Sequence, residues 1–452
     1  MKYVFLQRIA VLTFTIIAVL STAGFCTFNG TTGGSTKVVY GVLKKDPKVR
    51  SDGFVKANAV KNLDGQNDDQ GLTNLSIIKT HQVNDKILYS LTREKGLFKS
   101  MDGGVLWERV YIFPVGGGDQ QQIKVNDSIT ILDFDVDPNF GQIVYAAVLE
   151  NKLSKIYRSL DSGQTFSEIY TEIQTKENIT FVRVDPLNSM NVFAIIGGGA
   201  LIRSTDAGLT WEKIQNFDDD PIDMKFVPEF DQMFYILFVK QGLVYSKDNG
   251  SNWENLSFYR SPATVIGDEQ PKQGLENNLT TKEKTKLKFG RFEKLIPITA
   301  GLNFDYKTKR SSNPNGPKGW MLIADKQMWF AENLNSDFTK LVLPSQADQY
   351  ELYDLAPDPQ SGLDKIYVSV NNKLFLTTNR GRTWATSDMI NLLPVDGEGR
   401  AYSQTQNGKN VKMYTQEPGN ISQILIDKNN PEIIYLSLVN TKARRNNGFL
   451  VF

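Results

Sequence analysis

The sequence predicts an all-β fold, a single β-propeller of seven four-stranded blades. Three observations predict it. An eight-residue motif recurs along the chain, and each copy lies in a unit of roughly 40–50 residues. Each unit also carries four short stretches of strand type. Aromatic residues make up 11% of the chain, and Val and Ile are abundant, which favours strands over helices.

The chain begins with an export segment, residues 1–26, which is interpreted as a signal peptide or a membrane anchor. Lys2 and Arg8 give it a positive start, and Ile9 to Leu20 form an uncharged apolar core of signal-peptide length. The uncharged stretch continues to Phe28, so it is also long enough to remain in the membrane. We therefore expect an exported, extracytoplasmic protein that is either tethered through this segment or secreted.

The end of this segment leaves its processing open. Ser21 and Ala23 fit a small-x-small cleavage site. Cys26 lies where a bacterial lipoprotein signal places its lipidated residue, although Phe25 departs from the small residue that this signal has before the Cys. Residues 27–36 are rich in Gly and Thr and are predicted to be a flexible tether.

Residues 37–452 are assigned to the propeller. In each unit a first strand ends in an Asp/Pro turn such as Asp137 to Asn139, and second and third strands follow, with the motif between the third and the fourth. Residues 259–294 are a predicted insertion between blades 4 and 5. The last unit, from Ser422 to Phe452, has three strands and no motif, so Lys37 to Leu43 is predicted to supply its missing strand and close the ring.

The repeated motif reads as a hairpin turn. An Asp or Asn side chain accepts hydrogen bonds from nearby backbone N–H groups, a Gly two positions later takes a positive φ, and an aromatic residue begins the next strand. We assign structural roles to Asp102, Asp161, Asp206, Asp248 and Asn379 and to the aromatic residues Trp107, Phe166, Trp211, Trp253 and Trp384. A sixth copy, Ala331 to Phe338, keeps only the spacing and the aromatic residue.

This motif resembles the Asp-box, or BNR, repeat of β-propellers, and the copies extend from Ser100 to Trp384. Sialidases with this repeat also carry an Arg-Ile-Pro motif, which is absent here. Xyloglucan hydrolases of this type are similar in blade pattern but typically have two propellers, and sortilin-type domains add a cysteine-rich module. The chain most resembles the photosystem II assembly and stability factor type. That resemblance implies a non-catalytic scaffold that binds a protein.

Composition excludes several classes of function. The net charge is +1, so nothing favours nucleic acid as a partner. One cysteine and one histidine, His81, argue against a disulfide framework, a Cys/His metal site and Ser-His-Asp catalysis. We expect no cofactor, no metal and a monomer that touches a membrane only through its N-terminal segment.

Candidate ligand-binding residues lie in the predicted links between second and third strands. Most of these links carry a cation, namely Arg93, Lys95, Lys152, Lys240, Lys326 and Lys373. They are expected on the same face as the inter-blade connections, where they would form a basic rim suited to an acidic peptide, a polyanion or a carboxylate. Solvated lysines in polar turns are the plainer interpretation.

Three acids on one predicted strand, Asp133, Asp135 and Asp137, raise the alternative of a glycoside hydrolase. Similar acids recur at Asp185, Asp358 and Asp427, which suggests that this cluster serves the repeated turn. No catalytic residue is assigned, and the balance favours a non-catalytic protein-binding or assembly scaffold that acts through the inter-blade loops. The alternatives are a sialidase- or xyloglucanase-like hydrolase and a cell-surface glycan-binding protein.

Overall fold

A computed structural model describes most of the propeller. The described residues are 42–45, 55–56, 60–61, 67–68, 77–84, 86–93, 95–104, 107–112, 129–173, 177–227, 233–256, 259–260, 265–266, 285–286, 289–298, 304–305, 310–311, 319–332, 336–343, 352–370, 373–387, 405–406, 409–410, 420–427 and 430–439. All elements in these ranges are β-strands. The predicted export segment, Cys26 and the tether at residues 27–36 lie outside them. None of the described ranges contains a helix that is long and apolar enough to cross a membrane.

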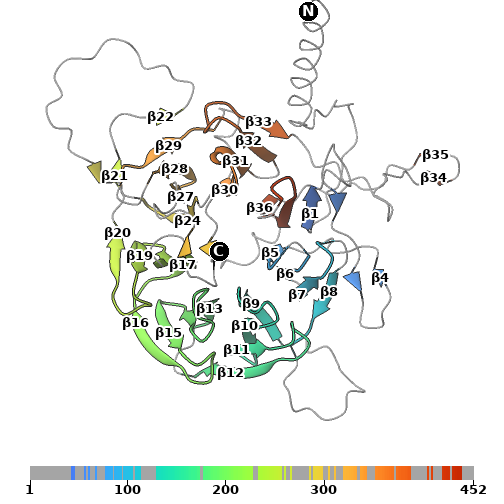
Figure 1. The fold of residues 1–452 in the computed structure, drawn as a ribbon, viewed down its shortest axis with the longest axis vertical. Helices are drawn as coiled ribbons and strands as arrows, with labels where there is room; N and C mark the ends of the chain where they lie inside the picture. Colours follow the sequence, from blue (N-terminus) through green and yellow to red (C-terminus); the bar gives the residue numbers. More distant parts are fainter. Residues whose placement is uncertain are drawn as a thin grey trace, which may run out of the picture.

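Seven of the sheets that the described strands form are arranged as blades around a central axis (Figure 1). Blade 1 contains β5 (Ile77–Gln82), β6 (Leu88–Thr92), β7 (Gly96–Ser100) and β8 (Trp107–Val110); blade 2 contains β9 (Ile129–Val136), β10 (Val144–Glu150), β11 (Leu153–Ser159) and β12 (Ser167–Glu172). Blade 3 contains β13 (Ile179–Val184), β14 (Val192–Ile196), β15 (Ala200–Ser204) and β16 (Glu212–Asn216); blade 4 contains β17 (Pro221–Val227), β18 (Met233–Phe238), β19 (Gly242–Ser246) and β20 (Glu254–Leu256). Blade 5 contains β24 (Phe292–Pro297), β27 (Trp320–Ala324), β28 (Gln327–Ala331) and β29 (Thr339–Leu341); blade 6 contains β30 (Leu352–Asp358), β31 (Gly362–Val370), β32 (Lys373–Thr377) and β33 (Ala385–Ser387).

Blade 7 joins the two ends of the chain. Its strand order is β36 (Asn420–Ile426), β37 (Ile434–Val439), β1 (Val42–Lys45) and β2 (Val55–Lys56). The prediction that an N-terminal strand completes the last blade is therefore confirmed. Its bounds and its place differ from the expectation of Lys37 to Leu43 as the fourth strand. The described strand β1 begins at Val42 and pairs directly with β37 as the third strand, and β2 takes the fourth place. The proposed strand at residues 448–452 lies outside the described residues.

Additional strands lie outside this four-strand pattern. β3 (Val60–Lys61) pairs in parallel with β8, and β22 (Val265–Ile266) pairs in parallel with β29, so blades 1 and 5 each gain a strand at the outer edge. β4 (Asn67–Asp68) pairs with β3. The remaining pairs are β21 (Tyr259–Arg260) with β23 (Thr285–Lys286), β25 (Phe304–Asp305) with β26 (Arg310–Ser311), and β34 (Thr405–Gln406) with β35 (Lys409–Asn410).

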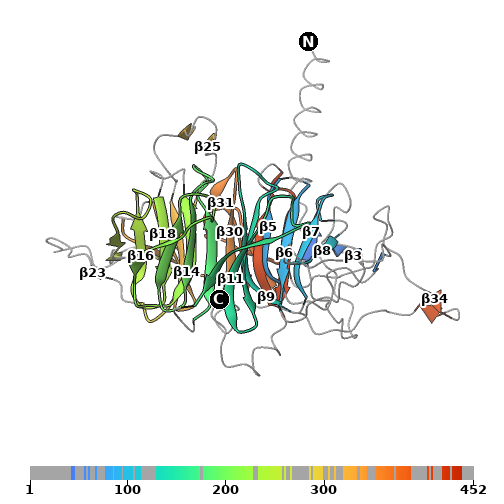
Figure 2. The same cartoon turned by 90° about the horizontal axis from the view of Figure 1, so that it is seen from below.

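The core lies between the blades. The second strands β6, β14, β18 and β27 are buried along their whole length, because each face of a blade packs against a neighbouring blade. The first strand of each blade, the inner strand, lies closest to the axis, and the blades stand side by side when the ring is seen edge-on (Figure 2). Successive strands are antiparallel, so the inter-blade connections share one face with the turns between second and third strands. We call this the loop face, and the opposite one, which carries the Asp-box turns, the box face.

The Asp-box turns form one repeated hydrogen-bonded structure. In blade 3, Ser204 Oγ accepts the Gly208 N–H at 2.7 Å and donates to Asp206. Asp206 in turn accepts the hydroxyl of Thr210 at 2.6 Å and its N–H at 2.8 Å, and these bonds lower the pKa of Asp206 to about 2. Gly208 has a φ of 93°, and a Cβ there would lie 2.5 Å from Ile169 Cδ1 of blade 2. The positive φ favours glycine here, and any larger residue would have to displace the end of the Ile169 side chain.

The boxes also join neighbouring blades. Tyr145, on the second strand of blade 2, donates its hydroxyl to the Ala207 carbonyl in the box of blade 3 at 3.3 Å. Arg158, on the third strand of blade 2, donates to the same carbonyl at 2.6 Å. At the ring closure, Tyr435 of blade 7 donates to Gly103 O of blade 1 at 3.2 Å. Each of these boxes therefore ends a hairpin and also binds the preceding blade.

Candidate functional site

The inner strands line the centre of the ring, and each of them contains a β-bulge. The pairing between inner and second strand shifts by one residue in all seven blades. The residue that follows the bulge, the post-bulge residue, is Lys79, Asp133, Phe181, Asp223, Lys294, Asp354 and Gln423 in blades 1 to 7. Six of these seven side chains are polar. A bulge leaves backbone groups unpaired and re-aims a side chain, so this position can serve contacts between blades.

Acidic post-bulge residues accept backbone N–H groups of the next blade. Asp133 Oδ2 accepts the N–H of Val182 in blade 3 at 3.1 Å. Asp354 Oδ2 likewise accepts the N–H of Ile424 in blade 7 at 2.7 Å. Val182 and Ile424 each come directly after the post-bulge residue of their own blade, so the bonded backbone group is the same in both junctions. These two carboxylates are 4% and 0% exposed.

Basic residues donate to the carbonyl group at the equivalent position, the residue directly after the post-bulge residue of the next blade. Lys79 Nζ donates to Phe134 O of blade 2 at 2.6 Å. In blade 3 the post-bulge residue is Phe181, and Arg183, two residues further, donates its Nε to Met224 O of blade 4 at 2.7 Å. The inner ring is thus held by side chain to backbone bonds of both polarities. The bulge recurs, whereas the residue type that uses it does not.

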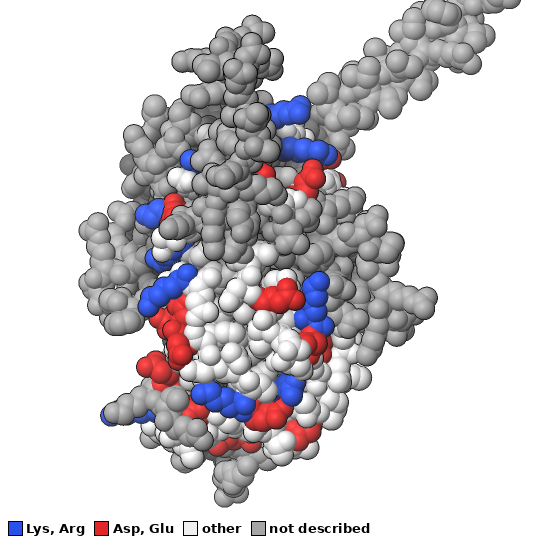
Figure 3. Space-filling model, turned by 90° about the vertical axis from the view of Figure 1, so that its left-hand side faces the viewer, with Lys and Arg blue, Asp and Glu red and all other residues white. Residues whose placement is uncertain are grey.

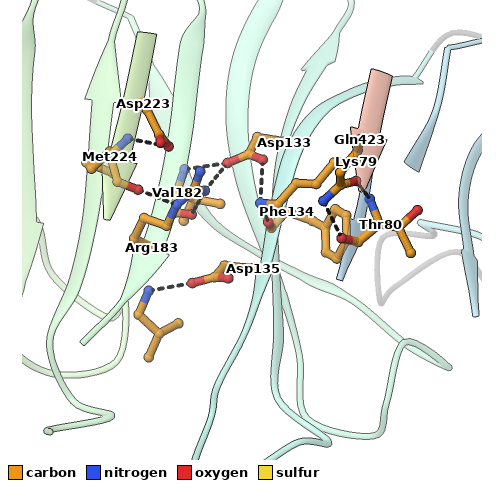
Figure 4. Close-up of polar contacts among 11 residues, drawn as sticks. Lys79, Thr80, Asp133, Phe134, Asp135, Val182, Arg183, Asp223, Met224 and Gln423 are labelled. Atoms are coloured by element: carbon orange, nitrogen blue, oxygen red, sulfur yellow. Dashed lines mark hydrogen bonds and ion pairs between the residues drawn. The ribbon is translucent and has the colours of Figure 1, made fainter. Parts of the chain in front are cut away.

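Asp133 lies at the centre of a charged cluster that joins three blades (Figure 4). Its Oδ1 pairs with Lys79 Nζ at 2.9 Å, and its Oδ2 pairs with Arg183 Nη1. Burial alone would raise the pKa of Asp133, but the charges and hydrogen bonds of Arg183 and Lys79 outweigh it and hold the pKa below its usual value. Asp133 is therefore a carboxylate that links blades 1, 2 and 3.

Asp135, two residues further on the same strand, has a different environment. It is half-buried, and its Oδ2 accepts the N–H of Val184 in blade 3 at 3.0 Å. Burial raises its pKa, against the lowering effect of Arg183 and Lys79. Two neighbouring acids of blade 2 thus have pKa values displaced in opposite directions.

Further ion pairs continue the ring through blades 4 to 6. Asp223 pairs with Lys225 at 2.8 Å, and Lys294 pairs with Asp354. Burial opposes the ionisation of Asp223, but Lys225 together with Arg183 and Lys294 holds its pKa below the usual value. Charges of both signs therefore alternate around the ring centre.

The sequence interpretation of the three acids needs a correction. Asp137 does serve the Asp/Pro turn, because its Oδ1 accepts the N–H groups of Asn139 and Phe140 at 2.8 and 3.2 Å. Asp133 and Asp135 do not, since both bind the inner strand of blade 3. The three acids alternate on one strand, so their residue type alone does not distinguish them. Their roles differ because of where the β-bulge falls in β9, and the sequence carries no pattern that marks the bulge.

The candidate cations Arg93, Lys95, Lys152, Lys240, Lys326 and Lys373 lie in or beside the turns between second and third strands. Lys95, Lys152, Lys240 and Lys326 are exposed, and Arg93 and Lys373 are half-buried. Asn151 and Lys152 have φ values of 51° and 67°, and Asp325 and Lys326 have 50° and 61°, as in two-residue hairpin turns. The turn of blade 4 is fixed by Asp219, whose Oδ2 accepts the Lys240 and Gln241 N–H groups at 2.9 and 2.8 Å.

Within the described ranges, no group of three or more His, Cys, Asp and Glu residues has the arrangement of a metal site. On one side of the ring, Lys and Arg are interspersed with Asp and Glu over the described surface (Figure 3).

A family model described as Sortilin, neurotensin receptor 3 (Sortilin-Vps10) matches residues 154–295. No curated protein matches the sequence. Among solved structures, the GH74 xyloglucanase from Xanthomonas campestris has a TM-score of 0.50 and 13% identity, covering 81% of this chain and 51% of its own. YCF48 bound to a D1 peptide has a TM-score of 0.49 and 14% identity, covering 82% of this chain and 94% of its own. The extracellular domain of a hybrid two-component system from B. thetaiotaomicron has a TM-score of 0.43 and 12% identity, covering 81% of this chain and 40% of its own.

The family model, the GH74 structure and the strand topology confirm the resemblance to Asp-box β-propellers. At 13% identity, the GH74 structure supports the architecture and no activity.

Proposed function

We propose that this propeller is an exported, non-catalytic scaffold that binds an acidic segment of a partner protein on its loop face. The observation that supports the proposal is that the polar side chains of the inner strands are engaged in contacts within the ring. Asp133, Asp223 and Asp354 are each paired with a cation, and Asp133 and Asp354 also bind the backbone of the next blade. These groups hold the ring together, so recognition is assigned to the loops that do not repeat.

The loop face offers both length and charge for this role. The chain runs from Leu256 to Phe292 between blades 4 and 5, and from Ser387 to Asn420 between blades 6 and 7. Long connections on a rigid scaffold are common places for binding. The exposed lysines of the second-to-third turns, such as Lys95, Lys152 and Lys240, lie on the same face and supply positive charge.

A charge-reversal experiment tests this proposal. The variant Lys95→Glu/Lys152→Glu/Lys240→Glu is compared with a control, Lys86→Glu/Lys213→Glu, which changes exposed lysines outside those turns. The probe is a fluorescein-labelled oligoglutamate peptide of about ten residues, measured by anisotropy at low and physiological salt. We expect salt-sensitive binding that the loop-face variant loses and the control keeps. Equal affinity of both variants, or no binding by the wild type, contradicts the proposal.

A glycoside hydrolase is the second candidate, and one observation favours it. Asp133 and Asp135 have pKa values displaced in opposite directions, a pattern typical of an acid and its partner in such enzymes. Turnover of xyloglucan oligosaccharides or sialosides by the wild type, abolished in Asp135→Asn, would establish this function. Absence of turnover on both substrate classes would leave the scaffold.

A further inference from the structure

We propose that the outer edge of blade 2, strand β12 with Leu153 and Ile173 at its loop-face end, binds an extended segment of a partner protein as a fifth strand. One end of this edge adjoins the loop-face turn of blade 2, since Leu153 directly follows Lys152, but backbone pairing along β12 does not depend on the proposed function.

The chain itself shows that a blade accepts a fifth strand. β3 pairs with the outer strand of blade 1 through Val60↔Trp107 and Lys61↔Glu108, and β22 pairs with the outer strand of blade 5 through Val265↔Lys340 and Ile266↔Leu341. Both added strands run parallel to the strand they cover. The outer edges of the other five blades, formed by β12, β16, β20, β33 and β2, have no such strand in the described residues. An exposed edge presents unpaired N–H and C=O groups and is a template for strand addition.

Among these five edges, that of blade 2 offers the longest strand for pairing. β12 has six residues, against five in β16, three in β20 and β33, and two in β2. β16 carries an exposed lysine, Lys213, which protects an edge against strand addition, whereas β12 contains no Lys or Pro. Its exposed acid, Glu168, is held within the blade by Lys155 Nζ at 2.8 Å and by the Thr171 hydroxyl at 2.5 Å.

An apolar pair at the end of β12 supplies a side-chain contact. Ile173 is 79% exposed and Leu153 is 43% exposed, and both belong to the small set of large apolar side chains that the described part leaves exposed. β11 and β12 pair through Ser154↔Glu172, and the same register carried one step further places Leu153 beside Ile173. Such a pair beside an open edge favours a ligand that combines backbone pairing with apolar side chains.

The expected occupant is therefore an extended segment parallel to β12, with a β-branched or other apolar side chain near its C-terminal end. β12 runs from the box face to the loop face, so a parallel segment brings that end next to Leu153 and Ile173. The strands that cover blades 1 and 5, Val60–Lys61 and Val265–Ile266, have this kind of composition.

The experiment uses the full chain and a synthetic peptide of residues 261–270, with a scrambled peptide as control. Because the edges of blades 1 and 5 are covered in cis, this peptide can add only at an uncovered edge. Binding is measured at millimolar peptide by hydrogen–deuterium exchange of residues 167–173 and by fluorescence anisotropy of the labelled peptide. We expect slower exchange in β12, and at least about tenfold weaker binding by Leu153→Lys/Ile173→Lys, since two apolar contacts are lost.

The matched control is Leu209→Lys, which changes a 71% exposed apolar residue on the box face. It should bind as the wild type does. All three positions are exposed, so the variants are expected to fold, and thermal unfolding of each checks this. The proposal is overturned if the peptide protects no residue of β12, if it protects β16, β20, β33 or β2 instead, or if the double variant binds with unchanged affinity.

Discussion

Replacing Asp133 by Ala should cause the largest loss of stability of any single change in the inner ring. The carboxylate is 4% exposed and binds Lys79, Arg183 and the Val182 N–H. Its removal leaves two cations without their partner, with side chains only 23% and 11% exposed, so solvent compensates little. Breaking a buried ion pair from one side costs about 3–5 kcal/mol, and the orphaned N–H is part of that loss.

The matched control is Lys225→Ala. Lys225 also pairs with an inner-strand acid, Asp223, but its side chain is 39% exposed. Solvent screening reduces that pair to about 1 kcal/mol or less. The loss of stability caused by Asp133→Asn should lie between those of Asp133→Ala and Lys225→Ala. Its amide oxygen still accepts the Val182 N–H, but the negative charge is gone.

Urea denaturation followed by tryptophan fluorescence measures these differences. We expect the transition midpoint of Asp133→Ala to fall far below that of Lys225→Ala at neutral pH. If the two midpoints shift by the same amount, or if Asp133→Ala leaves the midpoint unchanged, the assignment of Asp133 as an inter-blade link is wrong. A second check is Lys79→Met in the Asp133→Ala background, which should recover part of the loss, since one uncompensated cation is removed.

Three further predictions concern pH, glycine and the ring closure. First, the pKa of Asp133 is lowered in the fold, so its contribution to the free energy of unfolding is complete above the unfolded-state pKa of about 4 and is lost as the pH falls through the lower folded pKa. The pKa of Asp135 is raised, so Asp135→Asn should stabilise the protein at neutral pH, and this gain in stability should vanish below about pH 4. Urea titrations across pH measure both effects. Second, Gly208→Ala should lower the thermal midpoint well beyond Gly198→Ala, because both glycines have positive φ but only Gly208 meets another side chain, and equal shifts would contradict the close approach to Ile169. Third, Gln423→Leu should cost about 1–3 kcal/mol and accelerate hydrogen exchange in β37, because its amide accepts the Thr80 N–H at 2.7 Å and donates to Thr80 O at 3.0 Å; unchanged exchange in β37 would show that this pair does not hold the closure.

The parts of the fold that depend on local chemistry could be predicted from the sequence. The Asp-box turn closes on residues within a few positions of each other, as Ser204, Asp206 and Gly208 do, so its residue types are fixed wherever it occurs. Four strands per unit then follow from the spacing. The closing role of an N-terminal strand could be predicted as well, because the last unit lacks a strand.

The inner ring could not be predicted, for a physical reason. Its recurring feature is a β-bulge in the backbone. The backbone N–H and C=O groups beside the bulge are hydrogen-bonded by a different type of side chain from one pair of blades to the next. Lys79, Asp133 and Gln423 occupy the same position in three blades, yet they share neither charge nor shape. Asp133 binds Val182, 49 residues away, and a contact of that range leaves no pattern in a single sequence.

Blade 7 has a consequence for the order in which the blades of this molecule can be completed during synthesis. β1 and its partner β37 are separated by almost 400 residues of sequence. β1 therefore cannot pair with β37 until the chain between them has been synthesised. Until then the other blades can only form an open arc. The seam that finally joins blades 7 and 1 uses uncharged partners in part, with Gln423 on Thr80 and the Thr80 hydroxyl 2.9 Å from that of Ser437. When β36 and β37 finally pack against blade 1, these contacts can therefore form without the cost of desolvating a charged side chain.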